Sequence, residues 1–344
     1  MERIFAKAIE AGEAYKVVEG LQGFFVKRLD EVSSNFGNNQ AYSPIEWFRD
    51  EGKHGGGVRF VATDDTLFNR ASVNISQVQY DNDESKSLAS ATAISTIIHP
   101  VNPHVPSIHM HISWTQLKTG QGYWRVMADL NPSIMYDEDK EKFTSCLQKE
   151  SKEHFEAASA QGDRYFNIPV LNRHRGVSHF YLENFSTGDF QKDKAFAINM
   201  GEKVIQTYID IITNALKTRQ EISDADKDMQ LAYHTLYLFQ VLTLDRGTTS
   251  GLLVHSQNDV GVMGSIPRFV DVDLLRAWIP RMTQPQDSLL KAIADAITTQ
   301  DGQVDDTIKA KLAATVREHY QNNPKALSMQ ASGDVIPDTV ENHK

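Results

Sequence analysis

The chain has 344 residues, 40% of them apolar, and a net charge of −10 at pH 7, which permits a sizeable core but disfavours binding to nucleic-acid phosphates. No apolar run approaches the ~20 residues that span a bilayer, and the N-terminus lacks the apolar run and cleavage site of a signal peptide. The single cysteine, Cys146, rules out an intrachain disulfide, so we expect a cytoplasmic protein with no membrane span and no nucleic-acid partner.

The first half of the chain begins with a helical pattern and continues with strands. Apolar residues recur at helical spacing over residues 3–32, although three glycines interrupt them. The region from about 56 to 130 has the alternation and turn residues of strands. The predicted strands cover residues 58–63, 71–80, 93–99, 107–117 and 123–130. Short turns between them indicate an antiparallel meander.

The second half of the chain is mainly helical. We predict helices at residues 137–160, 192–216, 225–236, 271–278, 288–298 and 306–321, and strands at 176–182, 239–244 and 251–254. This order of elements predicts one α+β domain over residues 1–324, in which helices flank a large, mostly antiparallel sheet on both sides. The polar face of that sheet would form the floor of a cleft. Residues 325–344 would form a polar, mobile tail.

Four of the twelve histidines lie between Ser95 and Trp114. From residue 107 to 114 polar and apolar residues alternate strictly, which places His109 and His111 on one face of a strand. Such a pair can bind a metal ion with a third ligand from a neighbouring strand, and His99 is the candidate. The alternative is a polar strand face with hydrogen-bonded histidines. Ser95 shares a strand face with His99.

A carboxylate and several arginines are further candidates. Asp129 ends a strand, where it could act as a general base above a cleft or cap the following turn. Arg175 and Arg246 could bind substrate carboxylates through their planar guanidinium groups, or they could form structural ion pairs. The glycine run at residues 55–57 is not followed by Lys-Ser/Thr, so it favours a tight turn or close backbone approach over a phosphate loop.

Taken in order over about residues 55–280, these segments resemble the oxygen-dependent coproporphyrinogen III oxidases of haem biosynthesis. The specific matches are the run from Ser95 to His109 and the sequence Asp-Arg-Gly-Thr at residues 245–248. Weaker matches in the same order are Gly-Gly-Gly-Val at 55–58, Arg-Ala-Ser-Val-Asn-Ile-Ser at 70–76, Asp-Leu-Asn-Pro at 129–132 and Arg-Gly at 175–176.

The resemblance implies a flat sheet between helices, a homodimer and no organic cofactor. Dioxygen would be the co-substrate, and two propionates of a porphyrinogen would be oxidatively decarboxylated to vinyl groups. Asp129 would take the pyrrole N–H proton, His109 would be the acid–base histidine, and His99 would be its polar or metal-binding partner. Arg175 would hold a propionate. The other predicted substrate contacts are Ser95, His111, Ser113 and Arg246.

The chain also departs from the family pattern. The family's arginine four residues after the second histidine is Ser113 here, and its glycine run before the aspartate is replaced by residues 126–128. Its Gly-Gly-Arg loop aligns near residues 255–257, and its later histidines fall near Lys142, Thr144 and Val170. His111 is an addition. Two other hypotheses follow: an oxygenase or decarboxylase with a divalent metal on His99, His109 and His111, or a non-catalytic tetrapyrrole-binding protein.

Overall fold

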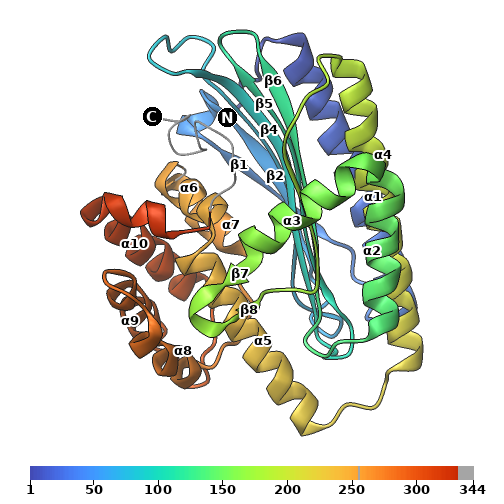
Figure 1. The fold of residues 1–344 in the computed structure, drawn as a ribbon, viewed down its shortest axis with the longest axis vertical. Coiled ribbons are helices and arrows are strands. Elements are labelled where there is room, and N and C mark those ends of the chain that lie inside the picture. The colour runs from blue at the N-terminus through green and yellow to red at the C-terminus, as the bar shows by residue number, and fades with distance from the viewer. Residues whose placement is uncertain (255, 332–344) are drawn as a thin grey trace.

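A computed structural model describes residues 1–254 and 256–331. Within these residues one seven-stranded antiparallel sheet has the order β1-β2-β3-β4-β5-β6-β9 (Figure 1). The strands are β1 (Ser43–Phe48), β2 (Gly55–Val61), β3 (Phe68–Gln79), β4 (Leu88–Pro100), β5 (Ser107–Leu117), β6 (Gly122–Asn131) and β9 (Ser178–Phe185). The predicted meander is confirmed. The sequence pattern missed β1 because its first four residues are all exposed and show no alternation in burial.

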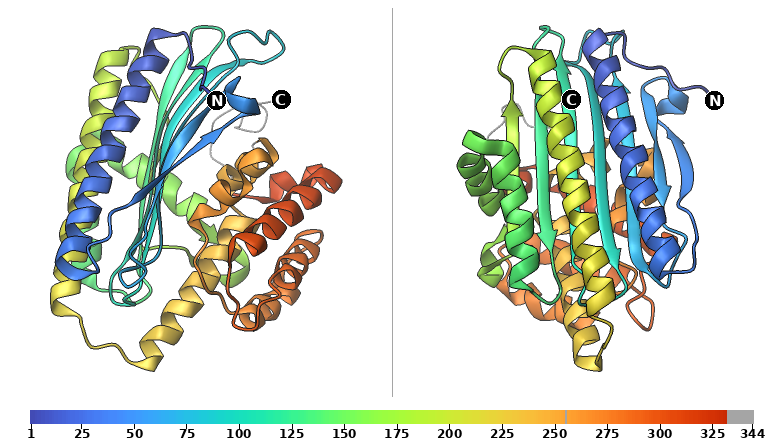
Figure 2. Two further views of the ribbon diagram at one scale, coloured as in Figure 1. Left: turned by 180° about the vertical axis from the view of Figure 1, so that it is seen from behind. Right: turned by 90° about the vertical axis from the view of Figure 1, so that its right-hand side faces the viewer.

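Three helices cover one face of the sheet. They are α1 (Ile9–Phe36), α2 (Asp137–Ser151) and α4 (Phe190–Thr218), and Figure 2 shows α1 and α4 running along the strands. Their buried side chains join those of the sheet in one hydrophobic cluster, in which Phe25 of α1 packs edge-on against Tyr208 of α4. The helix α1 is continuous despite its glycines.

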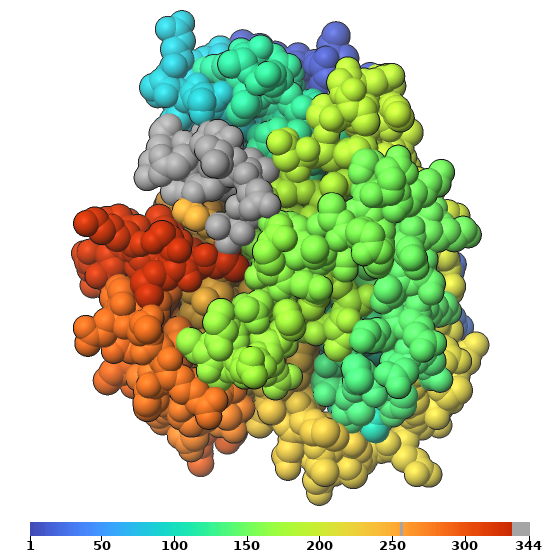
Figure 3. Space-filling view, in the orientation of Figure 1, coloured from blue at the N-terminus to red at the C-terminus, as the bar shows by residue number. Residues whose placement is uncertain are grey.

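The helix α3 (Phe155–Phe166) packs across the edge strand β9, and its Ala158 joins the first hydrophobic cluster. The opposite face is covered by α5 (Asp224–Thr243), α6 (Arg246–Val254), α7 (Asp259–Val262), α8 (Val272–Trp278), α9 (Gln286–Ala296) and α10 (Asp306–Asn322). Most of them share a second hydrophobic cluster, which Ile97 of β4 joins. At the surface, the green segment around α3 meets the orange helical layer (Figure 3). The predicted α+β architecture, with helices on both sides of the sheet, is therefore confirmed. None of the described helices is long and apolar enough to cross a membrane.

Two predicted strands are helices in the structure. Residues 239–244 belong to the end of α5 and its C-cap, and residues 251–254 belong to α6. In α5 every residue from Tyr233 to Thr243 is buried, so the helix has no polar stripe and its sequence resembles a buried strand. The predicted helix over residues 137–160 is broken at Lys152, where φ is 51°.

Two further predictions concern the tail and the glycine run. The start of the predicted tail contacts the body of the protein: the Ala331 amide donates to the Leu244 carbonyl at 2.9 Å, and the Gln330 side chain donates to Thr249 at 2.7 Å. The rest of the predicted tail, and His255 of the aligned loop, lie outside the described residues. The glycine run forms the start of β2, and a Cβ on Gly57 would lie 2.0 Å from the Ile75 carbonyl oxygen. The expected close backbone approach is confirmed there.

Candidate active site

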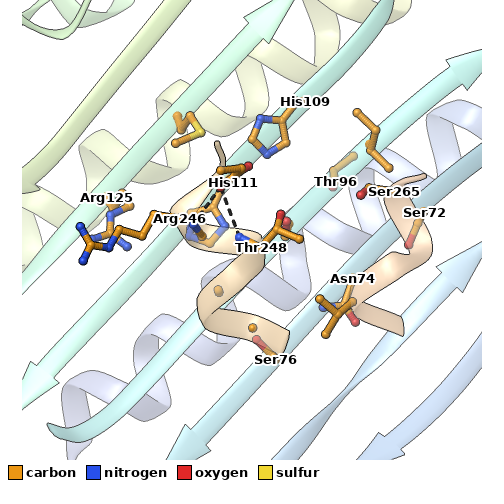
Figure 4. Close-up of a pocket in the computed structure, with 18 of the residues that line it drawn as sticks. Ser72, Asn74, Ser76, Thr96, His109, His111, Arg125, Arg246, Thr248 and Ser265 are labelled. Carbon is orange, nitrogen blue, oxygen red and sulfur yellow. Dashed lines mark hydrogen bonds between the residues drawn. The ribbon is translucent and has the colours of Figure 1, made fainter. Parts of the chain in front are cut away.

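A cavity of about 300 Å³ lies between the polar face of the sheet and the helices α6 and α7 (Figure 4). The lining residues of β3, β5, β6 and β9 alternate along the strand, as expected for one face of a sheet. The floor residues include Ser72, Asn74 and Ser76 of β3, Ser95 of β4, His109 and His111 of β5, Arg125 and Met127 of β6, and Tyr181 and Glu183 of β9. The opposite wall includes Arg246, Thr248 and Val262. The cavity is thus rich in hydrogen-bonding and charged groups.

His109 and Asp129 form a hydrogen-bonded pair at one end of this cavity. They are directly opposite each other in the β5–β6 register, and His109 Nδ1 lies 2.8 Å from Asp129 Oδ1. Burial would raise the pKa of Asp129, but the Arg175 guanidinium, then His109 and Asn131, hold that pKa below its usual range. Because an ionised carboxylate only accepts hydrogen bonds, His109 Nδ1–H donates to it, which leaves Nε2 as the other nitrogen of a cavity-lining imidazole.

Asp129 does not reach the cavity. It has no exposed surface, is absent from the cavity lining, and accepts hydrogen bonds from Arg175 at 3.0 Å and from Asn131. The sequence prediction of Asp129 as the group that takes the substrate proton therefore does not fit this geometry. A buried carboxylate bonded to an imidazole instead fixes the orientation and tautomer of the histidine.

Arg175 is likewise enclosed rather than available to a propionate. Its guanidinium lies between the rings of Phe166 and Tyr237, at 4.4 and 4.9 Å from their centroids, and it donates to Gln240 at 2.7 Å. Together with its bond to Asp129, these contacts make Arg175 the buried structural ion pair that the sequence analysis gave as the alternative. The prediction that Arg175 holds a propionate is therefore corrected. Its guanidinium binds Asp129 inside the protein instead.

His99 lies apart from His109 and His111. It has no exposed surface, and its ring nitrogens lie 2.8 Å from the Ser107 hydroxyl and 3.2 Å from the Ser265 carbonyl oxygen. Burial, with His234 nearby, lowers its pKa well below the usual value. The predicted three-histidine ligand set is not assembled, and the described residues contain no group of three or more His, Cys, Asp or Glu positioned to hold a metal ion.

The remaining predicted residues divide between the cavity and the packed interior. Ser95, His111 and Arg246 line the cavity, whereas Ser113 is 5% exposed and does not. Burial, then the charge of Arg125 and His109, lowers the pKa of His111 to about 3, so this histidine is neutral near pH 7. A neutral imidazole offers one hydrogen-bond donor and one acceptor to a bound molecule.

Arg125, Tyr181, Glu183 and Asp245 also line the cavity, although none of them was predicted from the sequence as a site residue. Arg125 shares its strand face with Asp129, so the alternation contained the signal. The strand predicted at 176–182 ended one residue before Glu183. Asp245 accepts hydrogen bonds from the Tyr165 hydroxyl and the Gly247 amide, both at 2.8 Å, and so fixes the start of α6 at the cavity wall.

Comparison with known proteins gives a consistent result. Residues 13–295 match the model of the family described as coproporphyrinogen III oxidase. A relative from Drosophila melanogaster, named oxygen-dependent coproporphyrinogen-III oxidase, is 27% identical over 271 residues, which cover 72% of this chain and 68% of the relative. A relative of the same name from Rickettsia bellii (strain OSU 85-389) is 26% identical over 235 residues, covering 64% of this chain and 81% of its own. The matched range contains every cavity-lining residue described above.

Proposed function

This chain belongs to the coproporphyrinogen III oxidase family, and from that premise we propose that it catalyses the oxygen-dependent oxidative decarboxylation of propionate side chains. The substrate is coproporphyrinogen III or a related porphyrinogen, and the product of the former is protoporphyrinogen IX of haem biosynthesis. The observation that carries the proposal is the His109–Asp129 pair at the edge of a polar cavity, on a sheet that matches this family.

The reaction balances without an organic cofactor. For each side chain, R–CH2–CH2–COOH and O2 give R–CH=CH2, CO2 and H2O2. The side chain loses two electrons and two hydrogens, the carboxyl carbon leaves as CO2, and dioxygen is reduced to peroxide. Two propionates require two such steps. The protein must therefore hold the ring, accept and return a proton, and position the propionate.

His109 is the group that moves a proton in this proposal. Its Nε2 belongs to a cavity-lining side chain, and Asp129 accepts the hydrogen bond from Nδ1, so the pair can stabilise the imidazolium that forms when Nε2 takes the pyrrole proton. Asp129 stays ionised and acts through His109. Arg175 keeps Asp129 in place and balances its charge.

Substrate contacts come from side chains around this pair. We propose that Arg246 binds a carboxylate, and that Ser95 and His111 hydrogen-bond to the ring or its substituents, because all three line the cavity. His109 and His111 are two residues apart on β5, and a divalent metal bound by these two histidines stays a prediction. His99 is no longer part of the predicted ligand set. Metal analysis of the purified, untagged protein tests it.

The test of the activity is direct. Purified protein incubated with coproporphyrinogen III and oxygen should form protoporphyrinogen IX, and exclusion of oxygen should stop the reaction. Absence of product with oxygen present would contradict the haem-pathway version of the proposal. Titration with haem or porphyrin, followed by absorbance, then tests the hypothesis of tetrapyrrole binding without catalysis.

We also propose that residues 1–324 act as one domain and that the protein is a homodimer, as the family resemblance implies. The single cysteine supports a cytoplasmic location. Light scattering should then give twice the 38.7 kDa of one chain. A mass of one chain across the working concentration range would contradict the dimer. Cell fractionation with an antibody to the protein tests the location.

A further inference from the structure

Arg125 lies at the opposite end of the cavity floor from His109. On β6 it is four residues from Asp129, the register partner of His109. At a rise of about 3.4 Å per residue, the two positions are roughly 14 Å apart along the strand. His111 and Met127, paired between them, form the intervening floor. Figure 4 shows His109 apart from Arg125, which lies in the same part of the view as Arg246. A ligand could therefore contact a guanidinium at one end and His109 at the other.

The Arg125 side chain is mostly buried, and its guanidinium lacks well-placed hydrogen-bond partners. Its side chain is 14% exposed, and its ion pair with Glu183 has an N–O distance of 3.7 Å, longer than a hydrogen bond. Its Nε atom is buried with no hydrogen-bond partner among the described residues. A buried charge is costly unless it is paired and hydrogen-bonded, so this site is incomplete.

Arg219, a buried arginine elsewhere in the chain, has the hydrogen-bond partners that Arg125 lacks. Arg219 donates hydrogen bonds to both carboxylate oxygens of Asp139, at 2.6 and 3.0 Å, and a further one to Glu138. That guanidinium is fully used by the protein, whereas Arg125 keeps donors that face a cavity. Across the strands, the position opposite Arg125 is a small residue, Ser113, which carries no charge to pair with the guanidinium.

We propose that Arg125 binds a carboxylate of the substrate and so sets which acidic side chain lies at the far end of the cavity from His109. The inference rests on the proposed function and names a specificity-determining residue for it. A carboxylate matches the geometry of a guanidinium fork and would supply the hydrogen bonds that Glu183 does not. Because Arg125 is remote from His109, it contributes to binding and leaves the chemical step nearly unchanged.

Anaerobic titration tests the binding role. Without oxygen the reaction cannot proceed, so coproporphyrinogen III can be titrated into the full chain and followed by tryptophan fluorescence. Loss of one charged contact in Arg125→Gln should weaken binding by roughly 10- to 100-fold. Arg125→Lys keeps the charge without the fork and should fall in between. Arg276→Gln, an exposed arginine on α8 paired with Asp273, is the matched control and should bind as the unaltered protein does.

Steady-state kinetics separate this inference from the proposed function. Arg125→Gln should raise KM by a similar factor at nearly constant kcat, as expected for a contact made equally in the ground and transition states. An active enzyme whose Arg125→Gln variant has unchanged Kd and KM would overturn the inference and leave the function standing. A protein that binds the substrate in an Arg125-dependent way but never turns it over would support the inference and contradict the function. A protein that binds no coproporphyrinogen III would overturn the inference and the haem-pathway version of the function.

Glu183→Gln distinguishes a ligand contact from a structural ion pair. If Arg125 binds the substrate, removal of the Glu183 carboxylate should leave substrate binding as tight or make it tighter. The thermal midpoint of the variant shows whether it is still folded. If Arg125 serves only to pair with Glu183, both variants should weaken binding to the same extent, and that result would overturn the inference.

Discussion

At the scale of single residues, the imidazole of His109 is fixed at one nitrogen by Asp129, and Asp129 in turn is held by Arg175. The three side chains form a series in which only the first lines the cavity. The acid–base role thus falls to a partly exposed group, and the two charged groups behind it supply orientation and electrostatic balance.

Asp129→Asn should lower kcat by roughly 10²-fold or more, the size of a general acid–base contribution, because an amide does not enforce the same tautomer or stabilise the imidazolium. His109→Gln should cost at least as much. If Asp129 acts only through His109, the double variant should be no slower than His109→Gln alone. A double variant that is much slower would show that Asp129 has a role of its own, as the sequence analysis first predicted.

Arg125 supplies a guanidinium next to the position where the sequence lacks one. The sequence marked Ser113 as the site of a lost arginine, and the structure places Arg125 directly opposite it in the neighbouring strand. A charge missing at one position of a sheet can thus be present one strand away. Only the strand register makes that visible, because the two residues are separated by a turn in the sequence.

At the scale of elements, β2 begins with glycines for a packing reason. A Cβ on Gly57 would lie 2.0 Å from the Ile75 carbonyl oxygen of β3 and 2.7 Å from the Trp47 indole nitrogen of β1. Trp47 is 9% exposed and its indole N–H donates to Asn74, which lines the cavity. Glycine at this position therefore allows an indole to cross the strand and support the cavity floor.

Gly57→Ala should destabilise the protein by about 1–3 kcal/mol, because the added methyl overpacks a site bounded by backbone. Gly20→Ala is the matched control: nothing lies within 4 Å of its Cβ position in the middle of α1, so it should stabilise by about 0.5–1 kcal/mol. Urea unfolding measures both. Equal effects of the two substitutions would contradict the packing argument.

At the scale of the whole molecule, the sheet and the second helical layer meet over buried polar groups as well as apolar ones. His99 of β4 packs against Tyr237 of α5, and Arg175 connects Asp129 of β6 to Gln240 of α5. Burial lowers the pKa of His234 to about 3, and it also lowers the pKa of His99 and of His111. These histidines are therefore neutral in the folded protein.

The buried histidines predict a loss of stability in mild acid. Their folded pKa values lie below the unfolded value of about 6.5, so the unfolded chain binds more protons below that pH and stability is greatest above it. For each neutral histidine, the free energy of unfolding should fall by about 1.4 kcal/mol when the pH is lowered from about 7.5 to about 5.5. For the three histidines together the loss should reach up to about 4 kcal/mol. Urea unfolding at the two pH values measures this. His234→Gln should reduce the difference in unfolding free energy between the two pH values by the contribution of one histidine. A stability independent of pH would contradict the prediction.

The sequence by itself determined the meander, the polar face of its strands and the family, because alternation and ordered motifs are local in the chain. Only the tertiary structure decided that α5 is a helix, since burial on all sides removes the polar stripe that identifies one. It also decided which charged residues reach the cavity. Asp129, Arg175 and His99 have the residue types of catalytic groups, but strand register and helix packing enclose them and leave His109, Arg125 and Arg246 at the cavity surface.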